Sequence, residues 1–151
     1  MPLLDLLGRL LLAVVLGAAI GVEREYHQKP AGLRTNILIA LGSALFTMLS
    51  AVMAGTGGTP DRIGAQIVTG IGFLGGGAIL RSRTTVHGMT TAATIWVNAA
   101  IGMAVGAGQF ALATATTVVT LVVLAALHPL ELYFEQRPGV KHENQHRFPD
   151  R

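Results

Sequence analysis

Residues 84–130 contain no Asp, Glu, Lys or Arg and read TTVHGMTTAATIWVNAAIGMAVGAGQFALATATTVVTLVVLAALHPL. These 47 uncharged residues are enough for two membrane spans, because a helix of about 20 apolar residues crosses about 30 Å of hydrocarbon. Two uncharged runs precede them, 26 residues between Arg34 and Asp61 and 18 residues between Arg62 and Arg81. The pattern predicts an all-α polytopic membrane protein, because a helix satisfies its backbone hydrogen bonds internally in lipid.

The composition supports the membrane class. Charged residues make up 13% of the 151-residue chain, about half the share in a soluble domain, and the mean hydropathy is +0.55. Cysteine is absent, which excludes disulfides and thiolate metal sites. The isoelectric point is near 10.0, but the basic residues fall in connectors and in the C-terminal segment. This distribution indicates membrane topology, and we expect no nucleic-acid partner.

Glycine, proline and charged residues divide the chain into about five predicted transmembrane helices. We expect residues 1–127 to form the transmembrane domain, with a retained first helix, and residues 128–151 to form a short polar cytoplasmic tail. The predicted helices are Leu3–Val22, Asn36–Ala54, Asp61–Leu80, Thr90–Val105 and Gln109–Leu127.

The basic residues predict the orientation of the chain. Nine of the eleven lie in the first connector, the third connector or the tail, which share one side of a five-helix protein. Basic residues concentrate on the cytoplasmic side of membrane proteins. We therefore expect the N-terminus to lie outside and the first connector and the C-terminus to lie in the cytoplasm.

Glycines are concentrated in the predicted spans and indicate close helix packing. Three pairs have the GxxxG spacing, which lets helix backbones approach each other in lipid. The segment IVTGIGFLGGGAIL of the third span alone contains five glycines, and we expect them to pack within the bundle or against a second copy. A hinge, or backbone that lines a ligand path, is the alternative for that span. The candidate packing positions are Gly17, Gly21, Gly72, Gly75, Gly76, Gly77, Gly102 and Gly106.

Charged and polar residues of the first and third connectors form the candidate functional cluster. We expect Glu25 to lie against the third connector, near its two arginines, where opposite charges would hold the cytoplasmic face in one shape for a partner. A solvated loop with charged ends at the interface is the alternative. The cluster comprises Glu23, Arg24, Glu25, Lys29, Arg34, Asn36, Arg81 and Arg83.

Few polar residues lie inside the predicted spans. Asn98 falls near the middle of the fourth, where an asparagine usually bonds a neighbouring helix. Asp5 and Arg9 are four residues apart, which predicts an ion pair within one helix. We find no catalytic motif and expect no enzymatic activity, no cofactor and no metal site. Glu23 and Glu25 could face Mg²⁺ as a carboxylate pair, but an interfacial charge cluster is the preferred interpretation.

Three long motifs carry a resemblance to a known family. They read GVEREYHQKPAGLRTN, DRIGAQIVTGIGFLGGGAILR and VHGMTTAATIWVNAAIGMAVGAG, and they span Gly21 to Gly108. In this order they resemble the membrane domain of the MgtC/SapB family, whose five-helix layout extends the match to Leu127. Many members carry an ACT-like domain after the fifth helix, whereas this chain has 24 residues there.

The resemblance implies a bacterial inner-membrane protein. Members of the family are linked to growth at low Mg²⁺ and to inhibition of the F-type ATP synthase. We therefore expect a regulatory or partner-binding role, in contact with the lipid bilayer and with a membrane protein such as that synthase. Transport of Mg²⁺ or another cation, as a transporter or channel, is the alternative.

Overall fold

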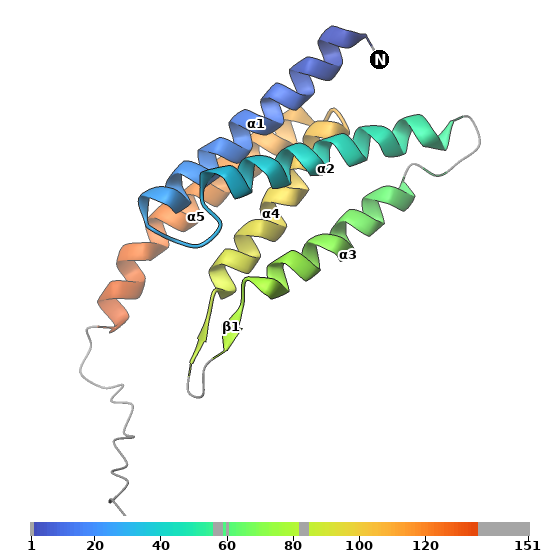
Figure 1. The fold of residues 1–151 in the computed structure, drawn as a ribbon. Helices are drawn as coiled ribbons and strands as arrows, with labels where there is room; N and C mark the ends of the chain where they lie inside the picture. The colour runs from blue at the N-terminus through green and yellow to red at the C-terminus, as the bar shows by residue number, and fades with distance from the viewer. Residues whose placement is uncertain (1, 56–58, 60, 82–84, 136–151) are drawn as a thin grey trace, which may run out of the picture.

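The computed structural model describes residues 2–55, 59, 61–81 and 85–135. Five helices account for most of these residues (Figure 1). They are α1 (Leu3–Tyr26), α2 (Leu33–Ala54), α3 (Asp61–Gly77), α4 (Met89–Gly106) and α5 (Phe110–Glu135). Two short strands, β1 (Leu80–Arg81) and β2 (Val86–His87), lie between α3 and α4.

The helices form a bundle in which α2 and α4 occupy the centre. Helix α1 packs against both, α5 packs against α1 and α4, and α3 packs against α4 and α2. Helix α3 lies on the other side of α2 and α4 from α5 (Figure 1). The main core joins α1, α2, α4 and α5 through mostly small and aliphatic side chains, which include Ala13, Ile20, Ala40, Ala44, Ile101 and Val105.

The outer surface of the bundle is apolar, as expected of a protein that lies in lipid. Leu11, Leu38, Phe73, Leu112 and Val119 are each at least 60% exposed. Four helices are long and apolar enough to cross a membrane, namely α1, α2, α4 and the Phe110–Leu127 part of α5. Helix α3 has 17 residues, which is the lower end of the usual spanning length of about 17 to 25 residues. The chain is an all-α polytopic membrane protein, as predicted.

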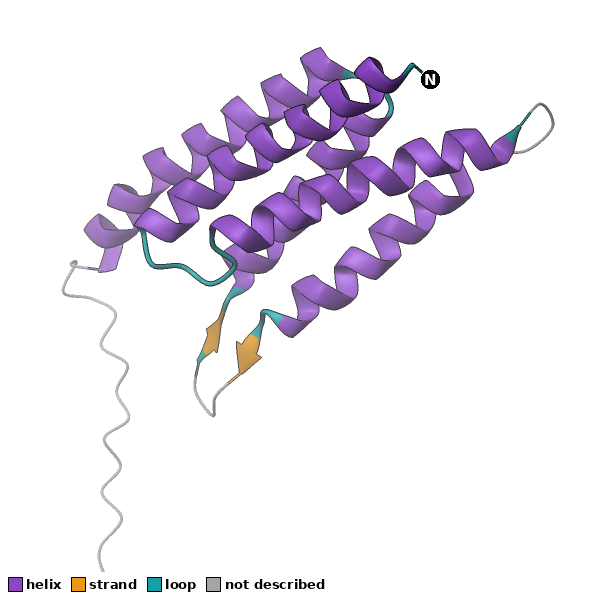
Figure 2. Ribbon diagram, turned by 45° about the horizontal axis from the view of Figure 1, so that its top comes forward, coloured by secondary structure: helices purple, strands orange, loops and turns teal. Residues whose placement is uncertain are grey.

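The third helix is shorter than the sequence predicted. It ends at Gly77 and not at Leu80, and the chain then enters two short antiparallel strands (Figure 2). In this pair Leu80 faces His87 and Arg81 faces Val86. Glycine costs about 1 kcal/mol relative to alanine in a helix, so the run Gly75–Gly77 favours an end to the helix there. Prediction by apolar length alone missed both strands.

The first connector is also shorter than predicted. Helix α1 continues to Tyr26 and α2 already begins at Leu33, so only six residues, 27–32, lie outside the helices. Helix α5 likewise runs past Leu127 to Glu135, so the predicted tail begins as helix, and residues 136–151 lie outside the described residues.

Candidate functional site

The predicted polar cluster separates into several contacts at one end of the bundle. Arg24 is only 3% exposed, and its Nη2 donates a hydrogen bond to Thr91 Oγ1 at 2.9 Å, which joins α1 to the beginning of α4. Glu23 Oε1 lies 3.1 Å from His27 Nδ1 one helical turn away. The charge of Arg24 is therefore held inside the molecule and not in a solvated loop.

Glu25 acts locally. Its Oε2 accepts a hydrogen bond from the backbone N–H of Leu33 at 3.0 Å, at the start of α2, where the first N–H groups of a helix have no partner inside it. The expected contact between Glu25 and the third connector does not appear among the described residues. Arg81, Lys29 and Arg34 are exposed, and Arg83 lies outside the described residues.

Asn36 and Asn98 form a buried polar contact between α2 and α4. Both are 0% exposed. Asn98 Nδ2 donates to the Asn36 backbone oxygen at 2.7 Å and to Asn36 Oδ1 at 3.1 Å, and Asn36 Nδ2 donates to the backbone oxygens of Ala31 and Gly32. Asn36, which the sequence assigned to the charged cluster, thus belongs to the helix contact predicted for Asn98. Asn98 Oδ1 is buried without a hydrogen-bond partner among the described residues.

Two GxxxG pairs bring α1 and α4 against α2 from different sides. A β-carbon at Gly17 would lie 2.8 Å from the Asn36 backbone oxygen, and one at Gly21 would lie 2.7 Å from the Leu33 α-carbon. A β-carbon at Gly102 or Gly106 would likewise collide with the backbone of α2. No side chain fits at these four positions without separating the helices.

The glycines of α3 differ from this pattern. A β-carbon at Gly72, Gly76 or Gly77 would meet no atom within 4 Å, and one at Gly75 would only reach ordinary contact with Ala92. Within the described chain, therefore, three of the four predicted packing positions of α3 face open space.

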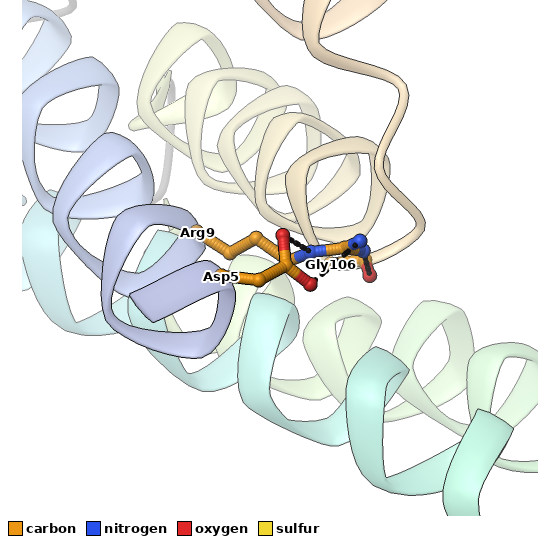
Figure 3. A network of polar contacts seen from close by, with 3 residues as sticks. All are labelled: Asp5, Arg9 and Gly106. Atoms are coloured by element: carbon orange, nitrogen blue, oxygen red, sulfur yellow. Dashed lines mark hydrogen bonds and ion pairs between the residues drawn. The ribbon is translucent and has the colours of Figure 1, made fainter. Parts of the chain in front are cut away.

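At the opposite end of α1, Arg9 joins three elements, and Figure 3 shows its contacts within α1 and with the end of α4. Its Nε lies 3.2 Å from Asp5 Oδ1, which confirms the predicted ion pair. Its Nη1 donates to the Gly106 backbone oxygen at 2.8 Å, and the guanidinium lies 5.6 Å from the centre of the Phe110 ring. Sequence reasoning missed the last two contacts, because they join residues about a hundred positions apart.

A groove of about 960 Å³ runs between α2 and α3 and has Ile95 of α4 in its wall. Most of its lining is aliphatic or aromatic. The backbone is accessible within it, because a β-carbon at Gly42 or Gly70 would meet no atom within 4 Å. Leu38, Ile39, Phe46, Ile67, Ile71, Phe73 and Leu74 contribute its apolar side chains. Among the described residues, no three His, Cys, Asp or Glu side chains are grouped so as to hold a metal ion.

The model of the MgtC family matches residues 10–133, which include most of each of the five helices and every contact described above except those of Arg9. The chain belongs to the MgtC family.

Several curated relatives are similar to this MgtC-family chain. Protein MgtC of Salmonella typhimurium is 52% identical over 112 residues, which are 74% of this chain and 48% of the relative. The putative magnesium transporter YhiD of Escherichia coli is 47% identical over 129 residues, 81% of this chain and 60% of the relative. An uncharacterized protein of Synechocystis is 48% identical over 130 residues, 86% and 55% of the two chains. The chain thus spans about half to three fifths of the length of these relatives, and no solved structure matches it.

Proposed function

We propose that this MgtC-family chain is an inner-membrane protein that binds a transmembrane helix of a partner protein and thereby regulates it. The groove between α2 and α3 carries the proposal. It has a volume of about 960 Å³ and apolar walls, and the glycines beside and within it leave helix backbone accessible. In lipid, close backbone approach and packing drive helix association, and small residues permit both.

The dimensions of the groove suit one helix. Its lining on α2 extends from Thr35 to Phe46, which corresponds to about 17 Å, or three turns, at about 1.5 Å per residue. Over that length a partner helix presents a row of apolar side chains, and the open positions Gly42 and Gly70 leave room for them. Lipid acyl chains or a helix of a second copy are the competing occupants.

Because the sequence motifs resemble those of the family, the membrane sector of the F-type ATP synthase is the first partner to examine. The proposed role of this contact is adaptation to low Mg²⁺. The orientation that we propose has the N-terminus outside and the C-terminus in the cytoplasm. The basic residues support this orientation. Lys29 of the first connector, His87 of the hairpin and Leu127 of α5 line one cavity, so the segments that carry or adjoin most of the basic residues meet at the same end of the bundle.

Cation transport is a second candidate, supported by the name of the Escherichia coli relative, a putative magnesium transporter. Mg²⁺ takes oxygen ligands and keeps part of its water shell, whereas the large groove is lined mainly by hydrocarbon. The lining favours the helix-binding function. A saturable Mg²⁺ flux into liposomes that contain only this protein would favour transport instead.

The chain has no native cysteine, so single-cysteine crosslinking tests the proposal directly. Gly70→Cys places a benzophenone label in the groove, and Val119→Cys places it on the exposed face of α5. In native membrane vesicles we expect illumination of the Gly70→Cys protein to give one dominant adduct with another membrane protein, which mass spectrometry identifies. The Val119→Cys control should give lipid adducts only.

Three outcomes would contradict the proposal. An adduct between two copies of the chain at Gly70→Cys would assign the groove to self-association. Lipid adducts alone at both positions would assign it to acyl chains. The same protein adduct at both positions would show that proximity in the membrane, and not the groove, produces the crosslink.

A further inference from the structure

A second cavity, of about 430 Å³, lies where α1 ends, α4 begins and α5 passes both. Arg24 and Lys29 contribute basic groups to its wall, and Glu23 contributes a carboxylate. Val123, Leu124 and Leu127 of α5 form its apolar side. The sequence had grouped the charged residues into a partner-binding face, but it could not show that they enclose a space together with α5.

Arg24 and Glu23, which line this cavity, each have a buried polar atom without a hydrogen-bond partner among the described residues, Nε of Arg24 and Oε2 of Glu23. One is a donor and the other an acceptor. A buried charged group without partners is unfavourable by several kcal/mol, and the hydrogen bond from Arg24 to Thr91 uses only one of five guanidinium N–H groups. Nε of Arg24 thus lacks an acceptor and Oε2 of Glu23 lacks a donor, although Oε1 of Glu23 lies 3.1 Å from His27 Nδ1.

The beginning of α4 adds to the positive potential of this cavity. Met89, Thr90 and Thr91 open the 18-residue helix and line the cavity, and the first N–H groups of a helix have no acceptor inside it. The residue before them, Gly88, provides no side-chain cap. A helix beginning carries about half a positive charge and binds anions such as phosphate.

We propose that this cavity binds a phosphate group, and that the phosphate belongs to the headgroup of an anionic membrane lipid. The phosphate oxygens accept from Arg24, from Lys29 and from the start of α4, and a hydroxyl of the headgroup donates to Glu23. The lipid source follows from α5, where Val123 and Leu127 are both 47% exposed, so that the cavity continues into the apolar surface on which an acyl chain lies. Basic pockets between transmembrane helices bind such headgroups in other proteins.

The test uses the whole chain in detergent, with native mass spectrometry as phosphatidylglycerol is added. We expect one retained lipid per chain and weaker retention of phosphatidylcholine, whose headgroup has no O–H or N–H donor for Glu23. Lys29→Gln should lower the affinity for phosphatidylglycerol about fivefold, and Arg24→Gln should lower it about tenfold or more. The matched control is Arg34→Gln, which removes an exposed charge close by but outside the cavity lining, and it should leave the affinity unchanged.

Competition with sodium phosphate against sodium chloride at equal ionic strength distinguishes the two sources of the phosphate group. No displacement assigns it to the lipid, and displacement assigns it to a free anion; both support a phosphate site. Equal affinity for the two lipids, or equal losses in Lys29→Gln and Arg34→Gln, would overturn it. If Arg24→Gln does not fold, the lysine comparison and the lipid comparison still decide. The proposal is independent of the partner that occupies the large groove.

Discussion

Arg9 shows how one residue holds distant elements of this molecule together. Its Nη1 donates to the Gly106 carbonyl at the end of α4, where the helix dipole favours a positive charge. Arg9→Gln leaves that carbonyl without its charged donor, so we expect the free energy of unfolding to fall by about 1 to 3 kcal/mol. Thermal unfolding of the detergent-solubilised protein measures this change.

The matched control for Arg9 is Asp5→Asn. It removes the ion pair and leaves the contact with Gly106, and partly exposed pairs contribute about 0 to 1 kcal/mol. If the two substitutions lower stability equally, the contact with α4 does not contribute what the geometry implies.

At the scale of elements, α2 is the helix against which α1, α3 and α4 pack. Gly102 lies against the α2 backbone, and a methyl group there collides with the Ala40 carbonyl. We expect Gly102→Ala to lower the free energy of unfolding by about 1 to 3 kcal/mol, because α2 and α4 must separate. Gly72→Ala, at a position with no atom within 4 Å, should instead be neutral or more stable by up to about 1 kcal/mol. Melting temperatures of the two proteins in one detergent give the comparison, and equal destabilisation would refute the packing argument.

At the scale of the whole molecule, the first connector, the hairpin end and the C-terminal part of α5 meet at one end. The orientation we propose places that end in the cytoplasm, because its connectors and helix ends contain four of the six basic residues that the structure describes, Arg24, Lys29, Arg34 and Arg81. Alkaline phosphatase fused after Gly55 should therefore be active, and after Glu135 inactive, since the enzyme folds only outside the cytoplasm. The reverse pattern would invert the orientation.

Much of this architecture could be predicted, because hydrophobic runs and turn residues act locally. The helix class, the approximate helix positions and the Asp5–Arg9 pair all follow from spacing along the chain. The early end of α3 and the hairpin after it could not be predicted from apolar length, because a glycine run is compatible with a tightly packed helix and with a helix end. The site was predicted only in part. Glu25 was expected to contact the third connector, whereas it accepts a hydrogen bond from the Leu33 N–H, and Arg24 bonds Thr91.

Two properties can be predicted from single segments of the chain, namely that it crosses a membrane as helices and that its glycines permit close approach. Both properties depend on composition within about 20 consecutive residues, the length of one span. The packing of the helices sets which glycines lie at a helix contact, since Gly17 and Gly102 lie against α2 whereas Gly72 has no atom nearby. The same packing buries Arg24 beside a cavity and leaves a groove between α2 and α3. These features depend on distances between helices far apart in the sequence, and no local pattern encodes such distances.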